Sequence, residues 1–274
     1  MRGFSDEVTP HYIVFESFGV RMEARASDPE ILDDLKPFLP PIERYAEMAE
    51  NVEDRNRFGI VREEDGRHSV WNPNTMVTTH VGQELAVMTM EGQMRSWLAV
   101  NAPGYIFVHA GVVGHDGKAV VMPGESFAGK TTLVAELVKR GAEYFSDEYA
   151  VIDSEGLVHP YPKPLGLRSR DALTSEDLPV ESLGGTAADV AVPLGLAVVT
   201  HYVPGAQWEP RRLSAGEGTL ALLSHTVPAR KRPAESMEVL TRAINGTVVL
   251  EGDRGEAEEF ADLLLSGGLV PEAS

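Results

Sequence analysis

One short segment limits the folds open to this chain more than any other feature. Residues 124–131 read Gly-Glu-Ser-Phe-Ala-Gly-Lys-Thr and fit the pattern G-x-x-x-x-G-K-[ST] at every fixed position. The apolar residues 119–122 before it predict a buried strand, and residues 131–140 after it predict a helix that Gly141 closes. This order of strand, loop and helix is the context in which the pattern binds the phosphates of a nucleotide, whereas an ordinary glycine-containing turn lacks it.

The residue types in the loop suit that chemistry. Glycines let backbone N–H groups close around phosphate oxygens, and the start of the following helix adds unpaired donors and the positive end of its dipole. We expect Lys130 to meet the β- and γ-phosphates and the Thr131 hydroxyl to hold Mg²⁺, so ATP and Mg²⁺ are the predicted cofactors. The predicted nucleotide-binding residues are Gly124, Glu125, Ser126, Phe127, Ala128, Gly129, Lys130, Thr131 and Thr132.

An acidic pair, Asp147 and Glu148, follows the loop after one predicted helix and a short predicted strand at residues 144–145. An acid at the end of that strand is typical of small kinases, where it accepts the proton of an attacking hydroxyl or holds the metal through water. We therefore predict Asp147 as general base and Glu148 as a contributor to the metal site. A solvated acidic turn is the alternative, because the chain has 42 acidic residues.

A histidine in the strand before the loop is the next candidate. If Asp116 and Gly117 form a two-residue hairpin turn, His115 pairs with Lys118, and the same register places His109 opposite Gly124. A histidine there could orient the predicted base or touch the transferred phosphate. The alternative is a hydrogen-bonded core histidine.

Arg168 completes the predicted catalytic set of Asp147, His109 and Lys130, with Lys163 as an alternative cation. Lys163 and Arg168 lie in the segment Pro-Lys-Pro-Leu-Gly-Leu-Arg, which the prolines stiffen. Either could stabilise phosphate charge in the transition state, although cations are also common on any protein surface.

The first hundred residues predict a separate small α+β unit. Residues 12–26 look strand-like, Ser27 and Glu30 form a capping-box pattern, and residues 84–101 predict a helix. Residues 58–61 and 68–71 flank a turn and predict a hairpin. We expect the domain boundary at Ala102-Pro103-Gly104, which gives an N-terminal domain at 1–101, a candidate for acceptor recognition, and a kinase domain at 102–274. Further strands are predicted at 105–113, 149–152, 157–158, 196–202 and 247–250, and further helices at 215–224, 234–244 and 257–265.

The charge and composition of the chain limit its partners and location. Its net charge of −18 repels nucleic-acid backbones and anionic lipid, so we expect neither as a partner; basic peptides are mildly favoured, and simple solubility is the other explanation. The absence of cysteine excludes disulfides, Cys-ligated zinc and a thiol nucleophile. Because no signal-peptide or membrane-spanning stretch is found, we expect a cytoplasmic protein. The sequence leaves open whether the chain forms a homo-oligomer.

Taken together, three segments resemble a known family. Residues 108–111 (Val-His-Ala-Gly), the loop, and residues 146–148 (Ser-Asp-Glu) are similar in order and spacing to the bacterial HPr kinase/phosphorylase family and its shorter kinase-like relatives. The resemblance covers residues 105–170. It implies an α/β fold, namely a P-loop nucleotide-binding domain of the HPr kinase/phosphoenolpyruvate carboxykinase type, here with a small N-terminal α+β domain. It also implies Asp147 as general base, His109 as its neighbour and Thr131 as a magnesium ligand.

The sequence therefore predicts an ATP- and Mg²⁺-dependent kinase that transfers the γ-phosphate to a hydroxyl, with Ser or Thr of a peptide or protein as the expected acceptor. Phe127, Thr131 and Glu148 stand where HPr kinases usually have Gly, Ser and a second Asp, which places the chain nearer to the kinase-like relatives. Some of these modify serine in peptides or as the free amino acid. A small-metabolite kinase and a nucleotide-dependent interaction module without transferase activity are the alternatives.

Overall fold

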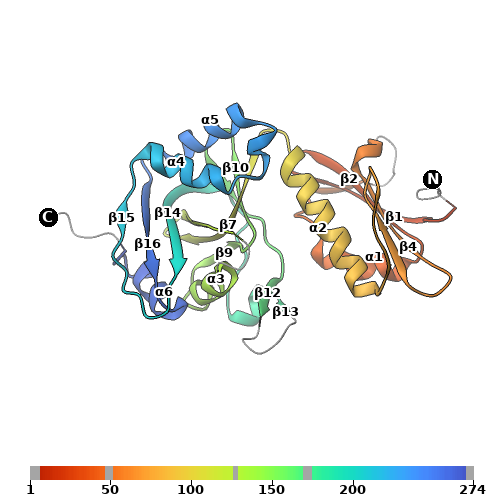
Figure 1. Ribbon diagram of the computed structural model, residues 1–274, viewed down its shortest axis with the longest axis horizontal. Coiled ribbons are helices and arrows are strands. Elements are labelled where there is room, and N and C mark those ends of the chain that lie inside the picture. Colours follow the sequence, from red (N-terminus) through yellow and green to blue (C-terminus); the bar gives the residue numbers. More distant parts are fainter. Residues whose placement is uncertain (1–6, 47–51, 126–128, 169–174, 270–274) are drawn as a thin grey trace. The chain divides into compact units, whose positions relative to one another are not determined.

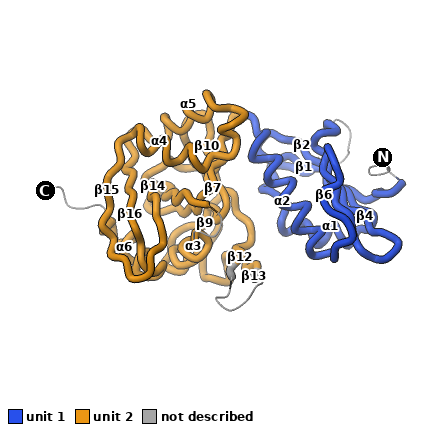
Figure 2. The backbone as a smooth tube through the Cα atoms, in the orientation of Figure 1, with its two compact units in different colours: residues 1–103 blue, residues 104–274 orange. Residues whose placement is uncertain are grey.

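The chain folds into two compact units of mixed α/β structure. The computed structural model describes residues 7–46, 52–125, 129–168 and 175–269. Unit 1 comprises Met1–Pro103 and unit 2 comprises Gly104–Ser274 (Figure 2). The division falls inside the segment Ala102-Pro103-Gly104, where the sequence predicts the domain boundary.

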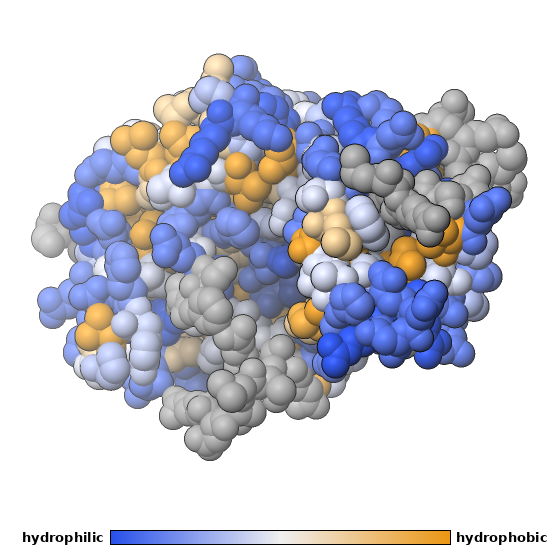
Figure 3. All heavy atoms as spheres, turned by 45° about the vertical axis from the view of Figure 1, so that its right-hand side comes forward, coloured by the Kyte–Doolittle hydropathy of each residue, from blue (hydrophilic) through white to orange (hydrophobic). Residues whose placement is uncertain are grey.

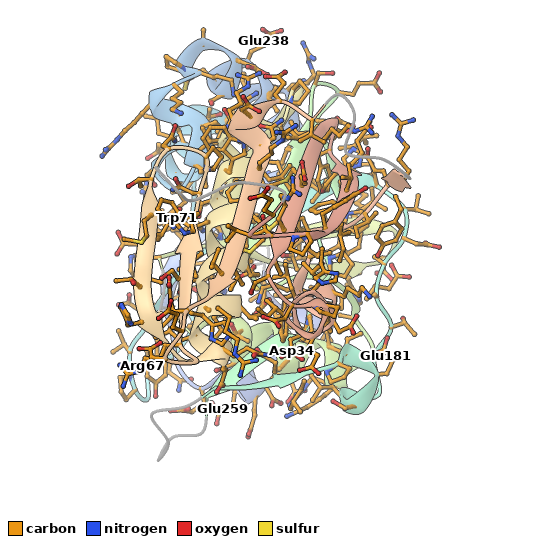
Figure 4. The ribbon with its side chains drawn as sticks, turned by 90° about the vertical axis from the view of Figure 1, so that its right-hand side faces the viewer. Asp34, Arg67, Trp71, Glu181, Glu238 and Glu259 are labelled. Carbon is orange, nitrogen blue, oxygen red and sulfur yellow. The ribbon has the colours of Figure 1, made fainter. Side chains whose placement is uncertain are left out.

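Unit 1 is a six-stranded sheet with two helices (Figure 1). The strand order is β3-β1-β2-β4-β5-β6. Figure 4 looks onto this sheet, with Arg67 in the turn before β5 and Trp71 at the end of that strand. The elements are β1 (His11–Ser17), β2 (Val20–Ala26), α1 (Pro29–Leu35), η1 (Lys36–Phe38), β3 (Arg44–Ala46), η2 (Asp54–Asn56), β4 (Arg57–Arg62), β5 (His68–Trp71), β6 (Met76–Val81) and α2 (Gln83–Asn101).

Two predictions for unit 1 need correction. The strand-like stretch 12–26 is a hairpin, because Phe18 and Gly19 adopt positive φ values of 43° and 71° and reverse the chain. The capping box at Ser27 is wrong. Helix α1 begins at Pro29 with Asp28 as N-cap, and the Ser27 hydroxyl donates to the Asp28 carboxylate at 2.8 Å instead. The reason is that proline is favoured at the first helical position, which moves the start of the helix by one residue.

Unit 2 contains an eight-stranded sheet in the order β11-β10-β7-β8-β14-β16-β15, with β9 paired to β7, and a separate pair β12-β13. Its strands are β7 (Tyr105–His115), β8 (Lys118–Pro123), β9 (Glu143–Ser146), β10 (Tyr149–Asp153), β11 (Leu157–His159), β12 (Leu165–Arg168), β13 (Ser175–Leu178), β14 (Val192–Tyr202), β15 (Arg211–Arg212) and β16 (Val248–Arg254). Its helices are α3 (Lys130–Lys139), η3 (Val180–Leu183), α4 (Ala215–Ser224), η4 (Val227–Arg230), α5 (Pro233–Ile244) and α6 (Ala257–Leu265).

The large sheet of unit 2 is covered on both faces (Figure 1). Side chains alternate along a strand, so Ala119 and Val121 of β8 pack in the core under α4 and α5, while Val120 and Met122 pack in the core under α3 and α6. Burial of both faces explains why these strands are continuous apolar runs in the sequence.

The direction of three strands decides where a site can form. Strands β8 and β14 are parallel, and so are β14 and β16. Their carboxyl ends therefore meet at one edge of the sheet, and β8 leads directly into the predicted phosphate loop. Open α/β sheets bind ligands at such an edge.

The outer surface carries the chain's many charged residues. The face drawn in Figure 3 is mainly hydrophilic, with hydrophobic residues scattered between. Among the described helices, none is long and apolar enough to cross a membrane.

Candidate functional site

The β7–β8 hairpin sets the register of the site. Asp116 and Gly117 adopt φ values of 50° and 71°, as the two central residues of a tight hairpin turn require. His115 pairs with Lys118, and the pairing continues to Ala110 and Pro123. One step further, the Gly124 amide donates to the His109 carbonyl at 3.2 Å. The predicted register is confirmed.

The backbone around His109 joins three parts of the site. Besides its bond from Gly124, His109 donates its own amide to the His225 carbonyl at the end of α4, at 2.9 Å. The next residue, Ala110, donates to the Glu148 carbonyl at 3.1 Å. The start of the loop, the acidic pair and the end of α4 are thus tied to one point of β7.

The His109 side chain lies beside Glu148. Its Nδ1 is 3.7 Å from Glu148 Oε1, and the two side chains are 41% and 25% exposed. Its ring also packs against Tyr149 with 5.0 Å between centroids. A half-exposed histidine at the mouth of a loop is placed for contact with a ligand, whereas a core histidine would be enclosed.

Gly129 and Lys130 form the described end of the loop. Gly129 caps α3 with a φ of 76°, a left-handed conformation that favours glycine. Lys130 Nζ donates back to the carbonyls of Gly124 at 3.0 Å and Glu125 at 2.7 Å, so the ammonium group lies over the start of the loop. Burial lowers the pKa of Lys130, and the charges of Glu148, Asp147 and Glu125 oppose that shift.

The other loop residues divide into described and undescribed positions. Thr131 and Thr132 occupy the first turn of α3, with Thr132 exposed. The predicted nucleotide-binding residues Ser126, Phe127 and Ala128 lie outside the described residues.

Asp147 is the best-held carboxylate of the site. Its side chain is 4% exposed. Thr131 Oγ1 donates to Oδ2 at 2.9 Å, while Tyr144 Oη donates to Oδ1 at 3.0 Å and Lys163 Nζ lies 3.3 Å from the same oxygen. Burial and the neighbouring Asp147 charge raise the pKa of Tyr144, so the phenol keeps its proton and remains a donor.

A serine turn places the two acids on different partners. The buried Ser146 side chain accepts hydrogen bonds from the amides of Glu148 at 3.1 Å and Tyr149 at 3.0 Å. This local bond shapes the short turn between β9 and β10, which pair one after the other with β7 and run in the same direction. As a result Asp147 contacts Thr131, while Glu148 lies beside His109.

Of the two predicted cations, the structure places one at the acid. Lys163 contacts Asp147, as given above, and its carbonyl lies 2.9 Å from Tyr144 Oη as a second acceptor for the single phenol proton. Arg168 ends β12, where it pairs with Ser175 of β13. Its side chain lies outside what the structure describes, so its role as a catalytic residue stays a prediction.

Two residues that contact this site, Tyr144 and Arg254, were not among the predicted site residues. Tyr144 precedes Asp147 by three residues. An aromatic hydroxyl in a predicted strand was an available signal, because such a group needs a hydrogen-bond partner when it is buried. Arg254 ends β16, where its guanidinium Nη2 lies 3.5 Å from the Gly129 carbonyl. The parallel order of β8, β14 and β16 would have pointed to it, but the sequence does not state that order.

The described residues that could hold a metal here form a partial ligand set. Among the described residues no group of three or more His, Asp or Glu could hold a metal by itself. Mg²⁺ usually takes one or two carboxylates, with phosphate oxygens and waters as its other ligands. The Thr131 hydroxyl, which already contacts Asp147, and the nearby Glu148 form such a partial set.

Comparisons with known proteins add little to this geometry. No protein-family model and no curated protein matches the chain. Among solved structures, the HPr(Ser) kinase/phosphatase from Coxiella burnetii matches 58% of this chain and 91% of its own, with 14% identity and a TM-score of 0.32. This likeness is too low to carry a functional argument.

Proposed function

We propose that unit 2 is an ATP- and Mg²⁺-dependent kinase that transfers the γ-phosphate to an alcohol hydroxyl. One observation carries this proposal. Thr131, in the first turn of the loop helix, donates a 2.9 Å hydrogen bond to the buried carboxylate of Asp147. The end of the loop that suits phosphate and the acid that suits a general base are therefore in direct contact.

The loop residues have clear tasks in this proposal. Lys130 would exchange the carbonyls of Gly124 and Glu125 for β- and γ-phosphate oxygens, which are stronger acceptors because they are charged. Thr131 and Glu148 would hold Mg²⁺. When bound, this ion neutralises part of the charge on the phosphates.

Asp147 would act as the general base. Its Oδ1 is held by Tyr144 and Lys163, which fixes the carboxylate, while the described contact to Oδ2 is the Thr131 hydroxyl. An acceptor hydroxyl could take the place of that donor. Asp147 then removes its proton as the acceptor oxygen bonds to the γ-phosphorus, and the bond between that phosphorus and the β–γ bridging oxygen breaks to release ADP.

His109 and Arg168 would support the transferred group. His109 lies beside Glu148 with its side chain half exposed, so it would contact the phosphate or the acceptor rather than the base itself. Arg168 is proposed to stabilise charge in the transition state. We propose Ser or Thr of a peptide or protein as acceptor, with unit 1 selecting it.

Calorimetry with Mg-ATP tests the nucleotide part of the proposal. The unaltered protein should bind, and Lys130→Ala should lose at least about a hundredfold in affinity, because a desolvated cation on the phosphates contributes several kcal/mol. Lys139→Ala is the matched control: it removes a lysine at the far end of α3 that pairs with Glu136, and it should bind normally. No heat with the unaltered protein would end the proposal.

Transfer from labelled ATP tests the rest. The full chain is incubated with a peptide library, a set of basic and neutral proteins, and a panel of hydroxyl metabolites that includes free serine. Label on Ser or Thr of a peptide or protein supports the acceptor proposed here. Label only on a metabolite would identify a small-molecule kinase, and binding without any transfer would identify a nucleotide-dependent interaction module.

A further inference from the structure

The last strand of unit 2 delivers an arginine to the phosphate loop. Arg254 ends β16, which runs parallel to β14, and its register partner there is Tyr202. Since β14 is in turn parallel to β8, the strand that enters the loop, Arg254 reaches the same edge of the sheet as Gly124. Arg254 is only 3% exposed.

The guanidinium packs against the second fixed glycine of the loop. Its Nη2 lies 3.5 Å from the Gly129 carbonyl, and a Cβ added to Gly129 would lie 2.8 Å from the same nitrogen. Real Cβ atoms do not approach so closely. The positive φ of Gly129 favours glycine, and a Cβ there would push the guanidinium away from the loop.

The contacted carbonyl is also the origin of the loop helix. Leu133 donates to the Gly129 carbonyl at 3.1 Å, which is the first hydrogen bond of α3. Arg254 thus touches the peptide unit from which Lys130 and Thr131 follow. A displacement of this unit would move both residues.

The arginine is held from its other side. Nη1 donates to the Gly255 carbonyl at 3.1 Å, and the guanidinium carbon lies 5.4 Å from the centre of the Tyr202 ring. The Tyr202 hydroxyl donates to Glu256 at 2.7 Å. These contacts join the guanidinium to β14 and to the start of α6, so it has little freedom to leave Gly129.

We propose that Arg254 is a positioning residue of the phosphate loop, which holds Gly129 in its left-handed conformation and adds a second positive charge beside Lys130 to raise affinity for the phosphates of a nucleotide. The inference rests on the proposed function, because the ligand is the nucleotide assigned there. Arginine suits this task better than lysine, since its planar group can contact two carbonyls and an aromatic face together.

Calorimetry with Mg-ATP and Mg-ADP at a temperature well below unfolding tests it. Arg254→Gln should weaken both nucleotides about tenfold or more, as expected for loss of a charged contact. Arg254→Lys keeps the charge without the fork and should fall between Arg254→Gln and the unaltered protein. Equal affinities in all three proteins would overturn the inference while leaving the kinase proposal intact.

A matched arginine separates positioning from general stability. Arg140 lies beyond the opposite end of α3 and pairs with Glu136 and Asp262 at 2.6 Å each. Arg140→Gln should lower the melting temperature with nucleotide affinity unchanged. If it weakened Mg-ATP binding as much as Arg254→Gln, the effect would be one of stability and the inference would fail.

A second variant covers the case in which Arg254→Gln does not fold. Tyr202→Leu removes the ring on which the guanidinium packs and leaves Arg254 present, and Tyr202 is 47% exposed, so the fold should tolerate the change. A loss of affinity of about threefold is expected, in line with the modest strength of such a contact. Unchanged affinity in both Tyr202→Leu and Arg254→Lys would overturn the inference.

Discussion

Each unit of this protein buries a carboxylate, and the two are held in different ways. In unit 1, Glu23 of β2 is fully buried, with Arg25 Nη1 at 3.2 Å and Arg57 Nε at 3.1 Å from its two oxygens. In unit 2, Asp147 is 4% exposed and is contacted by two hydroxyls and one ammonium group. Both contacts given for Glu23 come from guanidinium groups, while two of the three given for Asp147 come from hydroxyls.

The difference separates a structural role from a chemical one. Two guanidinium groups pair with Glu23, so removal of the carboxylate would take this counter-charge from the nearly buried Arg25. At Asp147, by contrast, another hydroxyl could replace the Thr131 donor, which belongs to the loop helix. Burial of an acid is therefore a weak indicator of function, and the identity of its donors is a better one.

The same amide substitution at both acids tests this difference between a structural and a chemical role most directly. The first variant is Asp147→Asn. Turnover with the acceptor found by labelled ATP should fall about a thousandfold, the usual scale for loss of a general base. Mg-ATP affinity should stay within about threefold, since Lys130 and the loop remain. A variant that turns over at the normal rate would remove Asp147 from the chemistry.

Glu23→Gln should do the reverse. The free energy of unfolding in urea should fall by about 2–3 kcal/mol because the nearly buried Arg25 loses this counter-charge, while Mg-ATP affinity is unchanged. Glu16→Gln is the control on the neighbouring strand: it breaks the more exposed pair with Arg44, at 2.6 Å, and should cost less than about 1 kcal/mol. A Glu23→Gln protein of normal stability that fails to bind nucleotide would reverse the assignment of the two acids.

Tyr144→Phe tests a hydrogen-bond donor of Asp147 while the acid itself stays in place. It removes one hydrogen bond to Asp147 Oδ1 and leaves Lys163 beside that oxygen. Turnover should fall about threefold to tenfold, and stability by about 1 kcal/mol, as for loss of one buried hydrogen bond. A fall as large as that of Asp147→Asn would show that the tyrosine does more than hold the base.

The smallest expected effect concerns pH. Burial lowers the pKa of His225 below its ordinary value of 6.5, with Lys130 and His201 acting in the same direction and Glu125 opposing them. As the pH falls through 6.5, the unfolded chain takes up this proton before the folded protein does, so stability is lost on acidification. The difference in unfolding free energy between the unaltered protein and His225→Gln should therefore shift against the unaltered protein from pH 7 to pH 5. A difference independent of pH would contradict the prediction.

Regular elements with strong local patterns could be read from the sequence. Helix α4 has the predicted bounds, 215–224, and α2 begins one residue before the predicted start. The hairpin β7–β8 follows from its Asp-Gly turn, because two residues in left-handed conformations leave one register.

Short strands could not be read in this way. Strand β6 (Met76–Val81) is largely exposed and carries polar residues, and β3 has three residues, so neither has a pattern of its own. Such edge strands form because a neighbouring strand offers unpaired backbone groups. The predicted helix start at Ser27 was wrong for a different reason. Two local signals competed there, and the preference of Pro29 for the first helical position prevailed over the capping-box pattern.

The candidate site divides in the same manner. A glycine in left-handed conformation followed by a helix start depends on adjacent residues, so the local structure at Gly129, Lys130 and Thr131 could be predicted from the sequence. The donors of Asp147 and the arginine on Gly129 come from β9, from residue 163 and from β16, which lie far from the loop along the chain.

The sequence alone predicts a glycine-rich loop between a buried strand and a helix, and an acid soon after it. Only the tertiary structure decided which side chains surround that acid and which cation packs on the loop. The physical reason is that backbone conformation depends on neighbours in sequence, whereas the partners of a buried charge depend on which strands pair at the same edge of the sheet.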